Sequence, residues 1–427
     1  MTLDTQNEDL MEVENTEFLD NLDEELKSMV DNAVEEMVEK AKAEKEKEDY
    51  QIIDKDAEIT IGDDIPRLTV ASKDLKALTD IISQQNGTEN MANTILMYAD
   101  GNELVCKNTD YKHYLSVRLP IVNKENILTD VLQLDNKSLI AVLKAAGRNV
   151  TIYKDSEATC KAFILGGEVS LDLAMYKPDK YEDVMEFEPY TTIKNSVFSK
   201  TLKDFIKIMN SAQTTNEKSI RFLNDYAYCI NSRAYTISND TYGEFSISNV
   251  EVKQLREILN FFPDDDLQVE KSGNSYLRIK GDNFSFSFTT MRVSPIDDSD
   301  LEKINALKSK KGYIVDRERL EIILDLIYTL YTGSGVIKVK PNFNANADEI
   351  FSINFMNNGE EQTFNIVTSR YELDEKPEDV SIEVPTTLLK NILQVYDKSV
   401  YKEIKITLSE DGLCIVADNY VSVILMR

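Results

Sequence analysis

A threefold repetition of one order of strands and helices constrains the fold of this chain more than any other feature. Three segments begin with a short apolar strand and continue as an amphipathic helix, starting at Arg67, Tyr190 and Gly312. They read "RLTVASKDLKALTD", "YTTIKNSVFSKTLKDF" and "GYIVDRERLEIILDL", with apolar residues at helical spacing in the second part of each. A small polar residue near each junction can cap the helix: Ser72, Asn195 and Asp316.

A second helix, followed by three short alternating strands, comes about 60 to 70 residues later in each segment. The strand regions "VTIYKDSEATCKAFILGGEVSLDL", "LQVEKSGNSYLRIKGDNFSFSF" and "IKITLSEDGLCIVADNYVSVIL" line up. Chance similarity of α+β domains is the alternative, but a threefold recurrence of the whole order argues against it. We therefore predict an α+β protein with three tandem domains, 61–190, 191–311 and 312–427, each with two helices packed on antiparallel sheets.

The first 60 residues differ in composition from the rest of the chain. They hold 21 acidic and six basic residues, which gives −15 of the formal net charge of −28. Apolar residues spaced by three and four over 17–48 predict one amphipathic helix. We predict an acidic, partly disordered extension over 1–60. Three roles stay open for it: a mobile extension, a partner-binding helix, or a negative arm that shields a basic surface.

Composition excludes several classes of protein. The four cysteines, Cys106, Cys160, Cys229 and Cys414, form no CxxC pair, and His113 is the only histidine, so no zinc-type cluster is predicted. We expect buried, reduced thiols in a cytoplasmic protein. No apolar stretch approaches the ~20 residues of a membrane helix, and no signal peptide is apparent.

No catalytic constellation stands out either. His113 lies in the alternating strand "DYKHYLSV" without a nucleophile motif, and "GSG" at 333–335 lacks the Lys and Ser/Thr of a phosphate loop. The run "PDDD" at 263–266 reads as a solvated turn rather than a cation site. We predict that the chain is not an enzyme, binds no metal and needs no cofactor.

The triple repeat, the repeat length and the ends of the repeats resemble the bacterial-type DNA polymerase III beta sliding clamp, a processivity factor. The resemblance covers about 61–427. The first repeat leaves through "LAMYKPDKYEDV", the second through "FTTMRVSPIDD", and the third ends on "YVSVILMR", similar to the family's terminus. The acidic extension departs from the pattern. The divergence suggests a virus-encoded relative, acting in a bacterial cytoplasm or an infected host cell.

The resemblance implies a head-to-tail homodimer of six domains, with helices lining the hole and strands outside. Such a ring needs basic side chains that meet phosphates without reading bases. Three of the six helices predicted in 61–427 hold more basic than acidic residues and two hold equal numbers, although the chain is acidic. The predicted DNA-binding residues are Lys73, Lys76, Lys137, Lys144, Arg148, Lys200, Lys203, Lys207, Lys253, Arg256 and Lys390. A solvated helix face is the alternative for any one of them.

The resemblance also implies an apolar pocket for partner peptides between the second and third domains, with the C-terminal strand as one wall. The residues that match by position are Asp240, Thr241, Tyr242, Phe245, Pro295, Val421, Val423, Leu425 and Met426. The bacterial family usually carries an Asp-Gly-His-Arg-like run where this chain has Asp-Thr-Tyr-Gly at 240–243. The pocket is therefore expected with a different peptide preference, or remodelled. A plain core strand is the alternative for 420–427.

The predicted function is a DNA sliding clamp that encircles double-stranded DNA without sequence preference and tethers the replicative DNA polymerase. Its expected partners are DNA, a polymerase, a clamp-loader ATPase and a second copy of the chain, but no membrane. The first alternative is a clamp-fold scaffold that recruits transcription or repair factors without encircling DNA. The second is a hydrolase whose site the sequence does not reveal.

Overall fold

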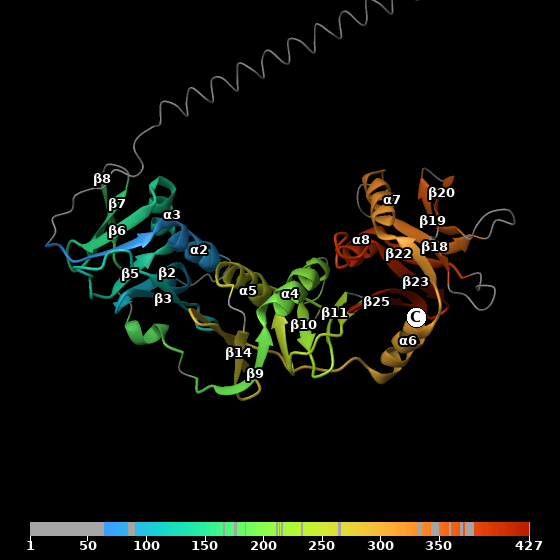
Figure 1. Cartoon of the computed structure of the whole chain (residues 1–427), viewed down its shortest axis with the longest axis horizontal. Helices are drawn as coiled ribbons and strands as arrows, with labels where there is room; N and C mark the ends of the chain where they lie inside the picture. The colour runs from blue at the N-terminus through green and yellow to red at the C-terminus, as the bar shows by residue number, and fades with distance from the viewer. Residues whose placement is uncertain are drawn as a thin grey trace, which may run out of the picture. The chain divides into compact units, whose positions relative to one another are not determined.

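The computed structural model describes residues 64–83, 90–164, 167–174, 177–183, 185–210, 212, 214, 217–231, 234–263, 266–330, 335–342, 350–357, 360–367, 370–371 and 380–426. The helix expected over 17–48 lies outside these ranges. The described part is a mixture of helices and antiparallel sheets, which confirms the predicted α+β fold class (Figure 1). In it, no helix combines the length and the apolar character needed to cross a membrane.

Seven α-helices lie in the described ranges, one more than the sequence predicted for 61–427. They are α2 (Ser72–Ser83), α3 (Asn136–Ala145), α4 (Asn195–Met209), α5 (Asn249–Phe261), α6 (Asp298–Ser309), α7 (Arg317–Leu330) and α8 (Thr386–Leu393). The additional helix is α6. Its apolar residues Leu301, Ile304 and Leu307 have helical spacing and two of its first three residues are acidic, so the sequence did contain a signal for it.

The strands follow one order three times. The first repeat has β1 (Arg67–Ala71), β2 (Thr94–Asp100), β3 (Glu103–Thr109), β4 (Tyr114–Pro120), β5 (Leu132–Asp135), β6 (Asn149–Lys154), β7 (Thr159–Ile164) and β8 (Gly167–Asp172). The second has β9 (Glu188–Lys194), β10 (Ser219–Phe222), β11 (Ala227–Asn231), β12 (Ala234–Ser238), β13 (Phe245–Ser248), β14 (Asp266–Ser272), β15 (Tyr276–Lys280) and β16 (Phe284–Thr289). The third has β17 (Tyr313–Asp316), β18 (Val336–Asn342), β19 (Ile350–Asn357), β20 (Glu360–Val367), β22 (Ile382–Pro385), β23 (Glu403–Ser409), β24 (Gly412–Ala417) and β25 (Tyr420–Leu425), with the two-residue β21 (Arg370–Tyr371) added.

Each repeat contributes strands to two sheets. In the first repeat the orders are β1-β6-β7-β8 and β5-β2-β3-β4, and the equivalent strands of the other repeats have the same orders. The helices pack their apolar faces on these sheets because their aliphatic and aromatic residues recur every three or four positions; α4, for example, buries Phe198, Leu202, Phe205 and Met209. The predicted domain boundaries at 190/191 and 311/312 stay predictions.

Only one of the three expected capping residues has a side chain bonded at a helix start. The Asp316 carboxylate accepts from the Arg319 N–H of α7 at 2.7 Å. Ser72 instead donates to the Gly147 carbonyl, and the Asn195 side chain accepts from Ser199. The Ser72 hydroxyl therefore bonds a carbonyl 75 residues away, whereas the Asn195 carboxamide bonds a side chain of its own helix.

Neighbouring repeats are joined by strand pairing. Strand β4 pairs with β16 from Tyr114–Ser287 to Val117–Phe284, and β12 pairs with β25 from Ala234–Ile424 to Ser238–Tyr420. These pairings produce one sheet of eight strands and one of nine, the ninth being β21. Helices meet at the same two junctions, α2 against α5 and α4 against α8. Each junction thus combines one strand pair with one helix pair.

Candidate functional site

The predicted DNA-binding residues lie mostly on the exposed faces of helices. Lys73 and Lys76 are on α2, Lys137 and Lys144 on α3, and Lys253 on α5, all exposed. On α4, Lys200 and Lys203 are exposed. Arg256, Lys207 and Lys390 are half-buried on α5, α4 and α8. The basic side chains are therefore spread over five helices drawn from all three repeats.

The spacing of Lys137, Lys144 and Arg148, seven and then four, predicts one helix face, but Arg148 lies outside the helix. Helix α3 ends at Ala145, and Ala146 is already extended. The chain is drawn into β6, whose first residue, Asn149, pairs with Ala71. Pairing with β1 therefore ends the helix three residues before Arg148, which is exposed in the following turn.

The α4 stripe of Lys200, Lys203 and Lys207 has two kinds of members. Lys207 donates to the Gln394 carbonyl just after α8 at 2.6 Å, so it helps to join α4 to the third repeat. The Lys200 ammonium lies 5.6 Å from the ring centre of Tyr420, whose hydroxyl donates to Asp204 at 2.9 Å. Burial raises the pKa of Asp204, although Tyr420 and the nearby lysines oppose the rise.

Two basic residues of the third repeat are engaged within the chain. The Arg317 guanidinium, 3% exposed, donates to the carbonyls of Tyr396 and Leu393 at the end of α8 and pairs with Glu321. It holds α7 against α8. Lys390 pairs with Asp325 at 2.6 Å and lies over the Tyr328 ring. The α7–α8 pair therefore offers fewer available cations than its sequence suggests.

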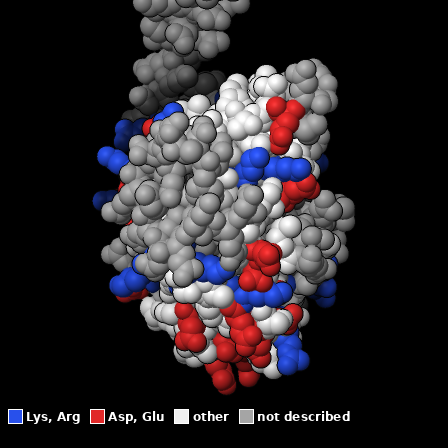
Figure 2. All heavy atoms as spheres, turned by 90° about the vertical axis from the view of Figure 1, so that its right-hand side faces the viewer, with Lys and Arg blue, Asp and Glu red and all other residues white. Residues whose placement is uncertain are grey.

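Figure 2 shows one face of the molecule, on which both signs of charge occur. Basic and acidic side chains lie close to each other over much of the described surface, while acidic ones gather at the lower end of the view. This face is therefore mixed rather than uniformly acidic.

The C-terminal strand β25 is buried on both faces. Tyr420 and Ile424 face the core shared with the helices, whereas Val421, Val423 and Leu425 face a second apolar cluster with Ile304 and Leu307 of α6. The strand period of two separates the two sets. Val421, Val423 and Leu425 are at most 6% exposed, so they are covered, whereas an open peptide pocket would leave them at the surface.

The residues expected to form one peptide pocket lie in different places. Tyr242 and Phe245 pack with Phe198 and Phe222 in the core of the second repeat, and the Tyr242 hydroxyl bonds Thr201 of α4 at 2.6 Å. Asp240, Thr241, Pro295 and Met426 are half-buried or exposed. The structure thus brings Val421, Val423 and Leu425 together, but not with Tyr242 or Phe245.

A close contact with Tyr190 explains the glycine in the Asp-Thr-Tyr-Gly segment at 240–243. Gly243 has φ +92°, and a Cβ there would lie 2.7 Å from the Tyr190 ring. This close approach lets the Tyr190 hydroxyl accept from the Glu244 N–H at 2.7 Å. Glycine at the fourth position therefore fixes the turn that sends Tyr242 into the core.

A small pocket of about 120 Å³ opens beside α6. Ile237 of β12, Val421 of β25, and Leu301 and Ile304 of α6 supply its apolar lining. Its polar lining comes from Asp225, Asn239, Asn305 and Lys308. The volume is close to the ~150 Å³ of an engineered cavity that holds benzene, so it is large enough for a single side chain.

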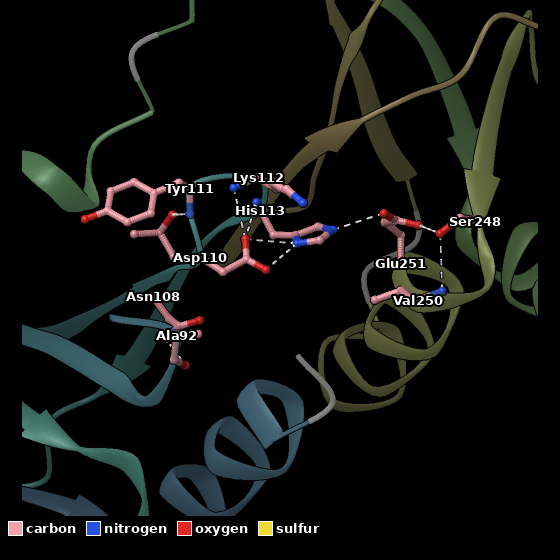
Figure 3. Close-up of polar contacts among 10 residues, drawn as sticks. Ala92, Asn108, Asp110, Tyr111, Lys112, His113, Ser248, Val250 and Glu251 are labelled. Atoms are coloured by element: carbon pink, nitrogen blue, oxygen red, sulfur yellow. Dashed lines mark hydrogen bonds and ion pairs between the residues drawn. The ribbon is translucent and has the colours of Figure 1, made fainter. Parts of the chain in front are cut away.

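His113, which the sequence places in a strand without a nucleophile motif, bridges two repeats (Figure 3). It lies just before β4, with its Nδ1 2.8 Å from Asp110 and its Nε2 3.0 Å from Glu251 of α5. Burial lowers the pKa of His113, but the two carboxylates outweigh it and raise the pKa to about 9. The pKa values of Asp110 and Glu251 are lowered: burial would raise them, and their bonds to the histidine outweigh it. The imidazolium therefore ties the first repeat to the start of α5 in the second.

Comparison with known proteins adds a fold relationship. No protein-family model and no curated protein sequence matches the chain. Solved structures do match: the DNA polymerase III subunit beta of Borrelia burgdorferi, at 13% identity and a TM-score of 0.67, covers 84% of this chain and 99% of that one. The Bacillus subtilis sliding clamp, at 14% identity and 0.66, covers 85% and 99%. The Pseudomonas aeruginosa subunit beta, at 14% and 0.65, covers 84% and 100%. A virus-encoded origin stays a prediction. The chain has the fold of the DNA polymerase III beta sliding clamps.

Proposed function

We propose that this chain is a DNA sliding clamp: two copies close head to tail around duplex DNA and tether a DNA polymerase, after a clamp-loader ATPase has placed the ring. Retention on DNA comes from the closed ring, and the helices supply weak, sequence-independent phosphate contacts. The observation that carries the proposal is a third junction between repeats. One chain holds the two strands that would form it, β8 and β20, but each stands at the end of its own sheet.

The two junctions inside the chain follow one rule. The strand at the end of one sheet of a repeat, β4 or β12, pairs with the last strand of the next repeat, β16 or β25. By this rule β20 of the third repeat needs a partner equivalent to β16 and β25, which is β8 of a first repeat. Both β8 and β20 stand at the ends of four-stranded sheets in the described part of the chain. A second copy can supply each missing strand.

The helices support the same conclusion. Helix α2 meets α5 and α4 meets α8, so α7 should meet α3 of a second copy. The outward face of α7 carries Ile322, Leu326 and Leu330 at spacings of four, with 62, 44 and 54% of their surfaces exposed. A run of large exposed apolar residues is typical of an interaction surface. A second copy would cover it.

The basic residues support the proposal that the ring encloses DNA. Exposed lysines lie on α2, α4 and α5, which form the junctions inside the chain, and on α3, which is expected to meet α7 of a second copy. A closed ring would therefore carry all of these lysines on its helices. Electrostatic contacts of this kind weaken steeply with salt. An acidic chain with bases on these helices would bind DNA there and repel it elsewhere.

The test is topological. The full-length protein is incubated at micromolar concentration with a linear plasmid, because a ring can thread onto a free DNA end without a loader. The plasmid is then closed with DNA ligase, passed through a gel-filtration column, and cut once. We expect the protein to elute with the circle and to be released after linearisation. Equal retention on circular and linear DNA would contradict encirclement and favour the scaffold alternative.

A variant of the α7 face links retention to ring closure. Ile322→Glu with Leu326→Glu places charges in the expected contact and should give a monomer in sedimentation and no retention on circles. The matched control is Ile322→Leu with Leu326→Ile, which keeps the face apolar and should behave as wild type. A charged variant that remains dimeric and is retained would show that α7 does not close the ring.

A further inference from the structure

We infer that α6 is a displaceable cover over an apolar groove of the clamp, and that short aliphatic peptides of partner proteins bind where α6 now lies. The inference rests on the proposed function, because a clamp that tethers a polymerase needs a surface to which its partners bind. The groove consists of Val421, Val423 and Leu425 of β25 with Tyr228 and Ile237 of the second repeat. What covers it is a segment of the chain itself.

The sheet under α6 does not depend on the helix. Strand β25 is held on one side by β12 and on the other by β24 through continuous ladders of backbone pairs. Helix α6 lies across β23, β24 and β25 and adds only side-chain contacts to this surface. Its removal would leave every strand pair in place and expose an aliphatic groove.

Helix α6 is weakly attached for an element of its length. Only Ile304 and Leu307 of its 12 residues are buried. The Asp297 side chain at its start makes no capping bond. Elements with few buried contacts open at a lower free energy than the global transition. The helix therefore has the properties of a segment that leaves its site while the rest stays folded.

Polar contacts hold its two ends from outside the core. Near the start, the Tyr235 hydroxyl donates to the Asp300 carboxylate at 2.6 Å. At the end, the ammonium of the half-buried Lys405 donates to the carbonyls of Lys308 and Lys310 at 3.0 and 3.1 Å. The two Lys405 bonds are exposed to solvent, so each contributes little net stability. Between them, the pocket at Ile237 and Val421 opens directly beside the helix.

The junction between the first and second repeats lacks such a helix. In its described part, Lys177–Asp183 and 185–187, the chain forms only the one-turn helix η2 (Pro178–Tyr181). The cover is therefore specific to the groove beside β25 and is not needed to connect two repeats. The chemistry of the occupant follows from α6 itself: aliphatic side chains at spacings of three, as in Leu301, Ile304 and Leu307.

The experiment uses the full-length protein and a fluorescent peptide with the sequence of residues 293–311. In the wild type the tethered helix has an effective concentration in the millimolar range and should exclude the peptide. The double substitution Ile304→Ser with Leu307→Ser in the protein weakens the binding of α6 itself to the groove and leaves the sequence of the free peptide unchanged. We expect this variant to bind the peptide at least roughly 10-fold more tightly than the wild type does in fluorescence anisotropy.

Two controls test whether the gain in peptide binding depends on the buried face of α6. Glu302→Ser with Lys303→Ser changes the exposed face of the same helix and should bind the peptide no better than the wild type. A peptide carrying the two serine substitutions should not bind the opened variant. In the unchanged protein, the backbone amides of α6 should exchange with deuterium at least about 10-fold faster than those of β25.

The inference is overturned if α6 amides exchange as slowly as those of β25, or if the folded serine variant binds the peptide no better than the wild type. If the serine variant does not fold, the exchange comparison in the unchanged protein decides by the same criterion. Neither measurement involves DNA or ring closure. A failure of the clamp proposal, seen as equal retention on circular and linear plasmid, is therefore distinguishable from a failure of the cover.

Discussion

At the scale of single residues, His113 has the most consequential surroundings. An imidazolium between two carboxylates from different repeats is a paired buried charge, and removal of one member leaves the others uncompensated. The ring also stacks on Phe286 at 6.0 Å, which holds its plane. The sequence indicated only that a histidine stands in a strand region, because its partner Glu251 is 138 residues away.

His113→Ala should destabilise the contact between the first and second repeats. The pKa of His113 is raised from 6.5 to about 9, so its stabilisation is fully present below pH 6.5 and is lost as pH rises through about 9. The lowered pKa values of Asp110 and Glu251 act at the other end, and their contribution is lost as pH falls through the acidic range. We expect a loss on the order of 3 kcal/mol in the free energy of unfolding at pH 7.

Urea unfolding of the wild type and the variant at pH 7 and pH 10 measures this effect. The difference between them should shrink at pH 10, where the wild-type histidine is neutral. Lys112→Ala, which removes an exposed neighbouring cation, serves as the control and should change the stability little at either pH. A difference that is equal at both pH values would mean that the charge of His113 is unimportant.

At the scale of elements, sequence patterns predicted which helices exist better than they predicted where a helix ends or what it contacts. Six helices follow from apolar spacing because that spacing decides which face is buried. The end of α3 could not be predicted, since Asn149 is drawn into pairing with Ala71, nearly 80 residues earlier. Nor could the burial of Val421 be predicted, because it requires knowing where α6 packs. Local periodicity carries no information on which element covers a face.

The exposed part of the α4 stripe gives an element-scale prediction. Lys200→Glu with Lys203→Glu reverses two exposed charges and should weaken binding of the protein to duplex DNA by roughly 10-fold or more at low salt, with a smaller effect at high salt. The fold should persist because neither ammonium donates to a backbone carbonyl in the described contacts. Fluorescence anisotropy with a labelled duplex at two salt concentrations measures the change.

Lys207→Glu provides the contrast on the same helix. Because the Lys207 ammonium holds the Gln394 carbonyl and pairs with Asp204, its reversal should lower thermal stability as well as DNA affinity. The sequence treats the three lysines as one stripe, whereas the structure separates two exposed charges from one that joins repeats. If all three substitutions weaken DNA binding equally and leave the melting temperature unchanged, that separation has no energetic meaning.

At the scale of the whole molecule, the repeat was readable from sequence and the closing surfaces were not. Three copies of one order of strands along the chain predicted the fold class. That β8 and β20 are edge strands is known only from the order of strands within the sheets. Both edges carry exposed acidic side chains, Glu168 and Asp172 on β8 and Glu361 on β20. The chain as a whole has a net charge of −28. If two copies meet edge to edge as proposed, the carboxylates of β8 and β20 repel each other across that strand pair.

This repulsion predicts that salt strengthens ring closure. Raising the ionic strength from about 0.02 to 0.3 M shortens the Debye length from over 20 Å to under 10 Å, which screens like charges across the two edges. The apparent dissociation constant of the dimer should fall several-fold, while affinity for DNA falls over the same range because phosphate contacts weaken. Sedimentation equilibrium for the dimer and anisotropy for DNA measure the two trends on one protein. A dimer that dissociates as salt rises would instead mean that ion pairs between the copies hold the ring closed, and the acidic edges would then have to meet basic side chains of the partner.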